Sequence, residues 1–145
     1  MALRDASWGR KGRVNEVSNV TTVTQIRPAE DVYVDHDRLG ALYSELGHAA
    51  AEDVVCRAIE ELALRMSHCD RLYRKSDFEG LRKSSRSLIA IAEQIGLSVV
   101  TRVATDVVTC IDSGDPVALG ATVARLMRTG EGSLTAIWDL QDLTI

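Results

Sequence analysis

Residues 81–97 read LRKSSRSLIAIAEQIGL, and this stretch decides the fold class. At about 100° per residue, most of its apolar and small side chains gather on one half of a helical wheel. Ser76 or Asp77 can cap the start of such a helix, and Gly96 can end it. The stretch therefore predicts an amphipathic helix with a stripe that faces a core. The stripe consists of Leu81, Ser84, Leu88, Ile91, Ala92 and Ile95.

The opposite half of this helix is mostly polar, and we expect it to face solvent. Its residues are Glu79, Arg82, Lys83, Arg86, Ala90 and Glu93. Ile89 falls on the same half and is the apolar exception on a polar face. This outward face is the candidate interaction surface of the chain.

Four further helices are predicted from similar patterns, near residues 35–46, 51–75 and 98–112 and from Pro116 to about Arg128. Pro116 suits a helix start, where its missing N–H would be unpaired in any case. Gly130 and Gly132 are expected to interrupt the last helix, and Ser133 to cap a final piece that reaches Leu140. Short connections favour antiparallel neighbours. The expected fold class is therefore all-α, an antiparallel up-and-down bundle.

Composition agrees with a single helical domain. The chain has 145 residues, 46% of them hydrophobic but only 4% aromatic, which suits a core of Leu, Val, Ile and Ala. A net charge of −4 gives no reason to expect a nucleic-acid partner. No apolar run approaches the roughly 20 residues that span a bilayer, and the N-terminus lacks the apolar core of a signal peptide. We therefore expect no membrane partner.

The three cysteines, Cys56, Cys69 and Cys110, are odd in number and widely spaced. This pattern suits reduced, mostly buried thiols in a cytoplasmic protein. No Gly-rich phosphate loop and no Cys/His spacing typical of zinc is present. We therefore expect no cofactor, no metal, no small-molecule substrate and no enzymatic activity. A deep polar pocket in the bundle would reopen the question of an enzyme.

Residues 1–31 differ from the rest in composition. Five basic residues outnumber the acidic ones before Ala29, and residues 14–26 are rich in Val and Thr, which is a weak strand signal. A flexible tail is one interpretation. A strand-like arm that lies on a neighbouring chain, and so forms a homodimer, is the other. The expected domains are an N-terminal arm at 1–31, flexible or ordered by a partner, and a helical domain at 32–145.

Residues 86–97 resemble the central helix of histidine-containing phosphotransfer (HPt) domains. That family carries a pattern close to His-x-Leu-Lys-Gly, followed six residues after that glycine by Gly-Ala. Leu88 and Gly96 match this pattern, and Ala90 stands near the first glycine. Arg86 occupies the position of the phospho-accepting histidine, and Ile89 that of the lysine that steadies the phosphoryl group. Both chemical positions have therefore changed.

The resemblance extends over about Val34 to Leu140. Upstream it includes an opening helix and a glycine turn, and downstream a helix at 99–111 followed by Ser113-Gly114-Asp115. It implies a four-helix bundle of HPt type with an additional short N-terminal helix. The upstream match consists of residues 34–39, Leu42, Glu45, Leu46 and Gly47.

The substitution at Arg86 excludes the relay chemistry of the family at that position. A guanidinium stays protonated at ordinary pH and offers no free ring nitrogen to a phosphoryl group. In the family this face docks the receiver domain of a response regulator, whose active site is an acidic pocket. The resemblance thus implies a two-component signalling protein that cannot carry phosphate and that binds a receiver or a histidine kinase. The docking face would comprise Arg82, Lys83, Arg86, Ile89, Ala90 and Glu93.

Three alternatives stay open. The basic residues of the face can be a solvated surface, with Ile89 covered by the N-terminal arm or by a second copy. The whole protein can be a homodimeric scaffold or regulatory subunit without a receiver partner. His36, His48 and His68 are expected to be ordinary surface or boundary histidines. The third alternative is a phosphorelay through His68, which we expect to be partly exposed in mid-helix. No lysine or glycine pattern of the family surrounds His68 to support it.

Overall fold

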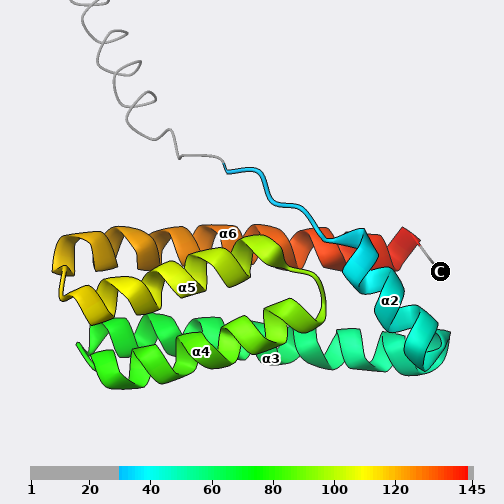
Figure 1. The fold of residues 1–145 in the computed structure, drawn as a ribbon, viewed down its shortest axis with the longest axis horizontal. Coiled ribbons are helices and arrows are strands. Elements are labelled where there is room, and N and C mark those ends of the chain that lie inside the picture. Colours follow the sequence, from blue (N-terminus) through cyan, green and yellow to red (C-terminus); the bar gives the residue numbers. More distant parts are fainter. Residues whose placement is uncertain (1–29, 144–145) are drawn as a thin grey trace, which may run out of the picture. The chain divides into compact units, whose positions relative to one another are not determined.

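The computed structural model describes residues 30–143, and within them the chain is all-α, with five helices and no strand. The short helix α2 spans His36–Leu46 and the long helix α3 spans His48–Arg74. They are followed by α4 at Phe78–Gln94, α5 at Ser98–Ser113 and α6 at Pro116–Leu143 (Figure 1). The prediction for residues 1–31 concerns residues 1–29 almost entirely, and these lie outside the described part.

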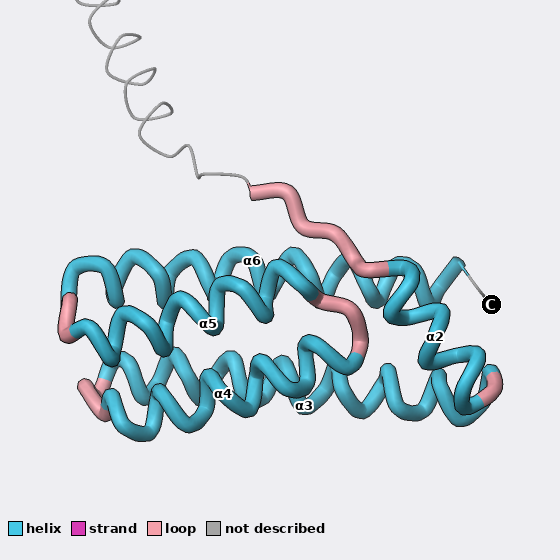
Figure 2. The backbone as a smooth tube through the Cα atoms, in the orientation of Figure 1, coloured by secondary structure: helices cyan, strands magenta, loops and turns pink. Residues whose placement is uncertain are grey.

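The four long helices lie side by side and are joined by short turns (Figure 2). Helix α4 packs on α3 and on α5, and α6 packs on α5 and on α3. Neighbouring helices α5 and α6 run antiparallel, since Asp106 pairs with Arg125 and Cys110 lies beside Thr122. Helix α2 packs on α3. Every long helix therefore has two neighbours against which to bury its apolar stripe.

The core consists of aliphatic side chains from α3, α4, α5 and α6. The predicted stripe of α4 is confirmed, because all its members are buried except Ile91, which is half-buried. Burial of each large aliphatic side chain stabilises the fold by about 1.5–3 kcal/mol, so the packed helix faces supply most of the driving force. The largest fully buried side chains include Leu62, Leu81, Leu88, Ile95, Leu126 and Ile137.

Aspartates begin three of the helices. Oδ1 of Asp35 accepts a hydrogen bond from the backbone N–H of Arg38 at 3.1 Å. Oδ1 of Asp77 accepts one from Gly80 N at 3.0 Å, so Asp77, and not Ser76, caps α4. Asp115 does the same for α6. Such a cap contributes about 1 kcal/mol, and the sequence predictions of these three starts are confirmed.

Gly96 follows the end of α4 and adopts a positive φ of 78°. Its carbonyl oxygen accepts a hydrogen bond from Asp35 N at 2.8 Å. A Cβ at Gly96 would lie 2.8 Å from the Asp35 carbonyl oxygen. Both the backbone conformation and this close approach therefore require glycine, which ties the start of α2 to the α4–α5 turn.

The prediction of an interrupted last helix is wrong. Helix α6 continues without a break through Gly130 and Gly132, and Ser133 is buried within it and caps nothing. One glycine costs a helix only about 1 kcal/mol relative to alanine. At Gly130 the absent side chain admits Met66 of α3, since a Cβ there would lie 2.5 Å from the Met66 sulfur. Helix packing therefore offsets the low helix propensity.

The predicted start of the second helix is also wrong, since it lies three residues after the start that the structure shows. Helix α3 begins at His48, directly after Gly47, whereas the pattern suggested Ala51. Gly47 has a positive φ of 82° and makes the sharp turn from α2 by itself. His48 is therefore the first residue of α3.

Candidate docking face on α4

Helix α4 presents most of the predicted docking residues to solvent. Lys83, Arg86, Ala90 and Glu93 are exposed and Arg82 is half-buried. Ile89 differs from the prediction, because its side chain is half-buried and packs against the core. An aliphatic side chain at the edge of the buried face of a helix stabilises the fold when it leans toward the neighbouring apolar surface, because it then loses contact with water. The apolar contribution of Ile89 to the exposed face is correspondingly smaller than expected.

Arg82 is engaged by an acidic residue of the neighbouring helix. Its Nε donates to Oδ1 of Asp112 at 2.8 Å, and its Nη2 donates to Oδ2 at 3.3 Å. The hydrogen bonds from Arg82 lower the pKa of the Asp112 carboxyl, with smaller contributions from the charges of Arg82 and Arg86. One of the three cations of the face is thus paired within the chain. Sequence spacing gave no sign of this pair, since 30 residues separate its members.

The face continues from α4 onto α5. Arg82 and Asp112 face each other near one end of the α4–α5 seam, while Glu93 and Thr101 line a shallow pocket near the other end. In this antiparallel register, Thr105 and Thr109 come next to the middle of the exposed α4 surface. Both threonines are exposed.

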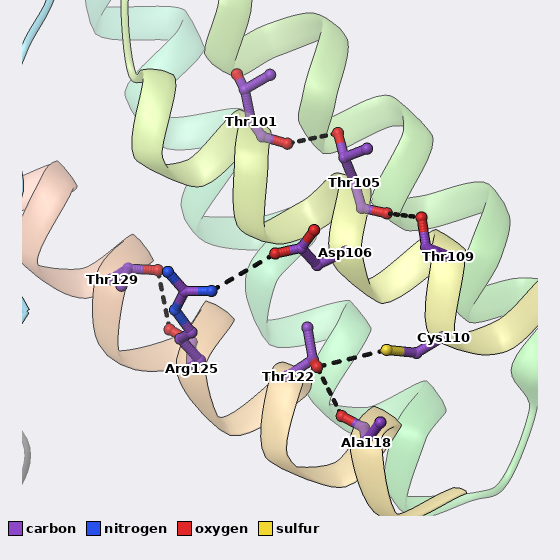
Figure 3. Close-up of polar contacts among 9 residues, drawn as sticks. All are labelled: Thr101, Thr105, Asp106, Thr109, Cys110, Ala118, Thr122, Arg125 and Thr129. Carbon is purple, nitrogen blue, oxygen red and sulfur yellow. Dashed lines mark hydrogen bonds and ion pairs between the residues drawn. The ribbon is translucent and has the colours of Figure 1, made fainter. Parts of the chain in front are cut away.

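The threonines of α5 form a row whose hydroxyl groups bond to the helix backbone (Figure 3). Thr105 Oγ1 donates to the carbonyl of Thr101 at 2.7 Å, and Thr109 Oγ1 donates to that of Thr105 at 3.1 Å. Because each hydroxyl proton is used within the helix, the side chains offer methyl groups and oxygen lone pairs to a partner. The row therefore adds weakly polar, uncharged surface on α5, next to α4.

No histidine stands at the centre of this face. His36, His48 and His68 are all exposed, and none belongs to α4. His48 pairs with Glu52 one turn further along α3, at 3.5 Å. His68 is more fully exposed than its position on the wheel suggested, and it lies in the middle of α3.

The three cysteines are free thiols in different environments. Cys69 is buried, where its Sγ donates to Ser84 Oγ at 3.3 Å, and burial raises the pKa of this thiol. Cys110 is half-buried beside Thr122. Cys56 is exposed, so the expectation of mostly buried thiols fails at this position. Its Sγ lies 3.9 Å from Oε1 of Gln141, so Cys56 is beside the last part of α6.

No three His, Cys, Asp or Glu side chains within residues 30–143 come together as metal ligands do. None of the described helices is both long enough and apolar enough for a membrane span. Comparison with protein-family models, with curated proteins and with solved structures found no match to this chain.

Proposed function

We propose that this protein is an HPt-like component of a two-component phosphorelay that cannot itself carry phosphate and that acts by binding a receiver domain or a histidine kinase. The observation that carries the proposal is Arg86. It stands exposed in the middle of α4, at the position that the resemblance assigns to the phosphorylated histidine. In this proposal the four long helices form the HPt bundle, α2 is the additional short helix, and the protein acts in the cytoplasm without enzymatic activity.

The chemistry of the face supports binding over catalysis. Arg86 and Lys83 make no ion pair within the described residues. Both are exposed, as is the small side chain of Ala90 one turn along α4 from Arg86. An acidic receiver pocket is a suitable counterpart for such cations. Arginine is also enriched at the centres of protein interfaces, where its planar group stacks and donates several hydrogen bonds. Arg82 contributes less free charge, since Asp112 pairs with it.

The test is a binding and transfer assay with phosphorylated and unphosphorylated receivers from the same organism. We expect binding in the micromolar range, and Arg86→Ala to weaken it about tenfold or more, as truncation of a central interface arginine typically does. Arg128→Ala is the matched control. Arg128 is also an exposed arginine, but it lies on α6, which packs on α5 and α3.

Two results would contradict the proposal. Acid-labile phosphate on the wild-type protein would show that it carries phosphate, and its loss in His68→Gln would identify the carrier. Equal effects of Arg86→Ala and Arg128→Ala would show that α4 is not the docking face. Ile89→Asp is a poor probe, because Ile89 packs on the core and its replacement also perturbs the fold.

A homodimeric scaffold is the second candidate, and an exposed tryptophan favours it. Trp138 on α6 is 53% exposed. It lines a shallow apolar hollow together with Ile59 of α3 and Leu134 of α6. Exposed tryptophans are enriched where proteins associate.

Sedimentation or light scattering of the full chain tests this candidate. A dimer that dissociates in Trp138→Ser, but persists in Val117→Ser, would favour the scaffold. Val117 is a suitable control because it is also an exposed apolar residue of α6. A wild-type monomer at high protein concentration would exclude the homodimer.

A further inference from the structure

A separate pocket is lined by residues of α2, of the first part of α3 and of the last part of α6. These parts of the three helices lie at the same end of the helical domain (Figure 1). Its volume is about 290 Å³. Its walls are mainly apolar, with Leu39 of α2, Val55 of α3 and Leu140 of α6 among the lining side chains. Pockets of this size and character are typical of sites for small organic molecules.

Gly40 indicates that the space in this pocket is kept open. It lies in mid-helix on α2 and lines the pocket, and a Cβ there would have no other atom within 4 Å. A mid-helix glycine costs about 0.5–1 kcal/mol relative to alanine. At three other helix glycines of the described chain a neighbour explains this cost, because a Cβ would come within 3 Å of another side chain. These are Gly80, Gly120 and Gly130. Among residues 30–143, no neighbour explains Gly40 in this way.

The polar groups at the pocket are hydrogen-bond donors or neutral groups. His36 and His48 both line it, and no Asp, Glu, Lys or Arg is among the lining residues. The ring of His48 lies against that of Tyr43, with centroids 5.6 Å apart. Nε2 of His48 lies 3.5 Å from a carboxylate oxygen of Glu52, which leaves Nδ1 as the nitrogen of this ring available to a ligand. The two imidazoles and the amide of Gln141 are therefore the polar side chains with N–H groups in a mainly apolar and aromatic lining.

We propose that this pocket binds a small aromatic carboxylate. Its ring would lie against Tyr43 and the open backbone at Gly40, where a flat group can approach closely. Its carboxylate would accept hydrogen bonds from the imidazoles of His36 and His48. The acid brings acceptor oxygens to a lining that has N–H donors and no carboxylate of its own. This site is separate from the α4 face, and the proposal does not depend on a receiver partner.

Benzoate is the probe, and benzylammonium is its counterpart with the same ring and the opposite charge. NMR spectra of the full chain are recorded during titration with each. Benzoate is expected to shift the signals of Tyr43, Leu39 and Leu140 with a Kd of about 1 mM, as befits so small a ligand. Benzylammonium is expected to bind at least about fivefold more weakly, because it lacks an acceptor for the imidazole N–H groups.

Two variants of α2 form a matched pair. Gly40→Leu places a side chain in the pocket and is expected to lower the affinity for benzoate at least about tenfold. Ala41→Leu adds the same side chain to the next residue, which is exposed and does not line the pocket. It should leave the affinity unchanged. Gly40→Met serves the same purpose if Gly40→Leu alters the amide spectrum as a whole.

His48→Phe tests the polar half of the proposal. Phenylalanine retains a ring to pack on Tyr43 but has no N–H donor, so the preference for benzoate over benzylammonium should fall. Three results would overturn the proposal. In the first, benzoate at about ten times the expected Kd does not shift the pocket signals. In the second, Gly40→Leu and the wild type bind benzoate with equal affinity, and in the third, the wild type binds benzoate and benzylammonium with equal affinity.

Discussion

Replacement of Gly130 by alanine tests how α3 and α6 fit together. Gly130 is buried and faces Met66 of α3. A Cβ added there would lie 2.5 Å from the Met66 sulfur, and the terminal methyl group would be closer still. Met66 is only 7% exposed, so its side chain has little room to move aside. The added methyl group therefore overpacks the contact between the two helices.

The expected effect follows from two opposing free energies. Alanine stabilises a helix relative to glycine by about 1 kcal/mol. Overpacking of a well-packed core costs about 1–3 kcal/mol. The free energy of unfolding should therefore fall by about 1 kcal/mol in Gly130→Ala, which corresponds to roughly 4 °C in Tm for a domain of this size.

Urea unfolding of the variants measures this difference, with Gly40→Ala as the comparison. At Gly40 the new methyl group meets no atom within 4 Å, so only the helix term acts. This variant should gain about 0.5–1 kcal/mol. Met66→Leu shortens the opposing side chain, so Gly130→Ala should cost less in that background than in the wild type. If Gly130→Ala stabilises the protein as much as Gly40→Ala does, this result contradicts the close contact between Gly130 of α6 and Met66 of α3.

Three further outcomes are expected. Hydrogen bonds from Arg82 lower the pKa of Asp112 in the folded protein. The stability that this carboxylate adds is therefore fully present above the pKa of Asp in the unfolded chain, about 4, and is lost as the pH falls through the lower pKa of the folded protein. The free energy of unfolding of Asp112→Asn should therefore depend less on pH between about 5 and 2; an unchanged dependence would contradict the pair. A thiol reagent at about pH 8 should modify Cys56 at once and Cys69 at least about a thousandfold more slowly, because burial keeps the Cys69 thiol protonated until the protein opens. Mass spectrometry of the modified sites checks this, and comparable rates would contradict it. Arg86→His should acquire acid-labile phosphate from a phosphorylated receiver. If this variant binds the receiver without acquiring phosphate, position 86 does not correspond to the phosphorylated histidine of HPt domains.

The helices were predictable because each carries its own local signals. The apolar spacing of α4 identifies its buried side, and Asp77 and Gly96 mark its two ends. The continuation of α6 was not predictable from such signals. Local propensity makes Gly130 a helix breaker, and the reason that it is not one lies in Met66, which is 64 positions away in the chain and meets it only after α3 and α6 pack.

The composition of the docking face shows the same limit. Helical spacing places Arg82, Lys83 and Arg86 on one side of α4, as the structure has them. It does not show that Asp112 reaches across from α5 to Arg82, because nothing in the spacing sets the register between two helices. It also overestimates the exposure of Ile89, whose side chain can lean either way from the edge of the stripe.

These differences concentrate the proposed recognition on Arg86. With Arg82 held by Asp112 and Ile89 packed against the core, Ala90 is the exposed apolar residue that remains of the predicted docking face. Arg86 has the exposed Ala90 one turn further along α4 and lies within electrostatic range of the Asp112 carboxylate. On α5, the hydroxyl protons of Thr105 and Thr109 are already used within the helix. A partner that approaches this face therefore meets two exposed cations that make no ion pair within the described residues, Arg86 and Lys83. We therefore expect an acidic pocket that encloses the guanidinium of Arg86 to bind this face with higher affinity than a flat acidic surface does. An ion pair on a flat surface stays exposed, and an exposed ion pair contributes little in water.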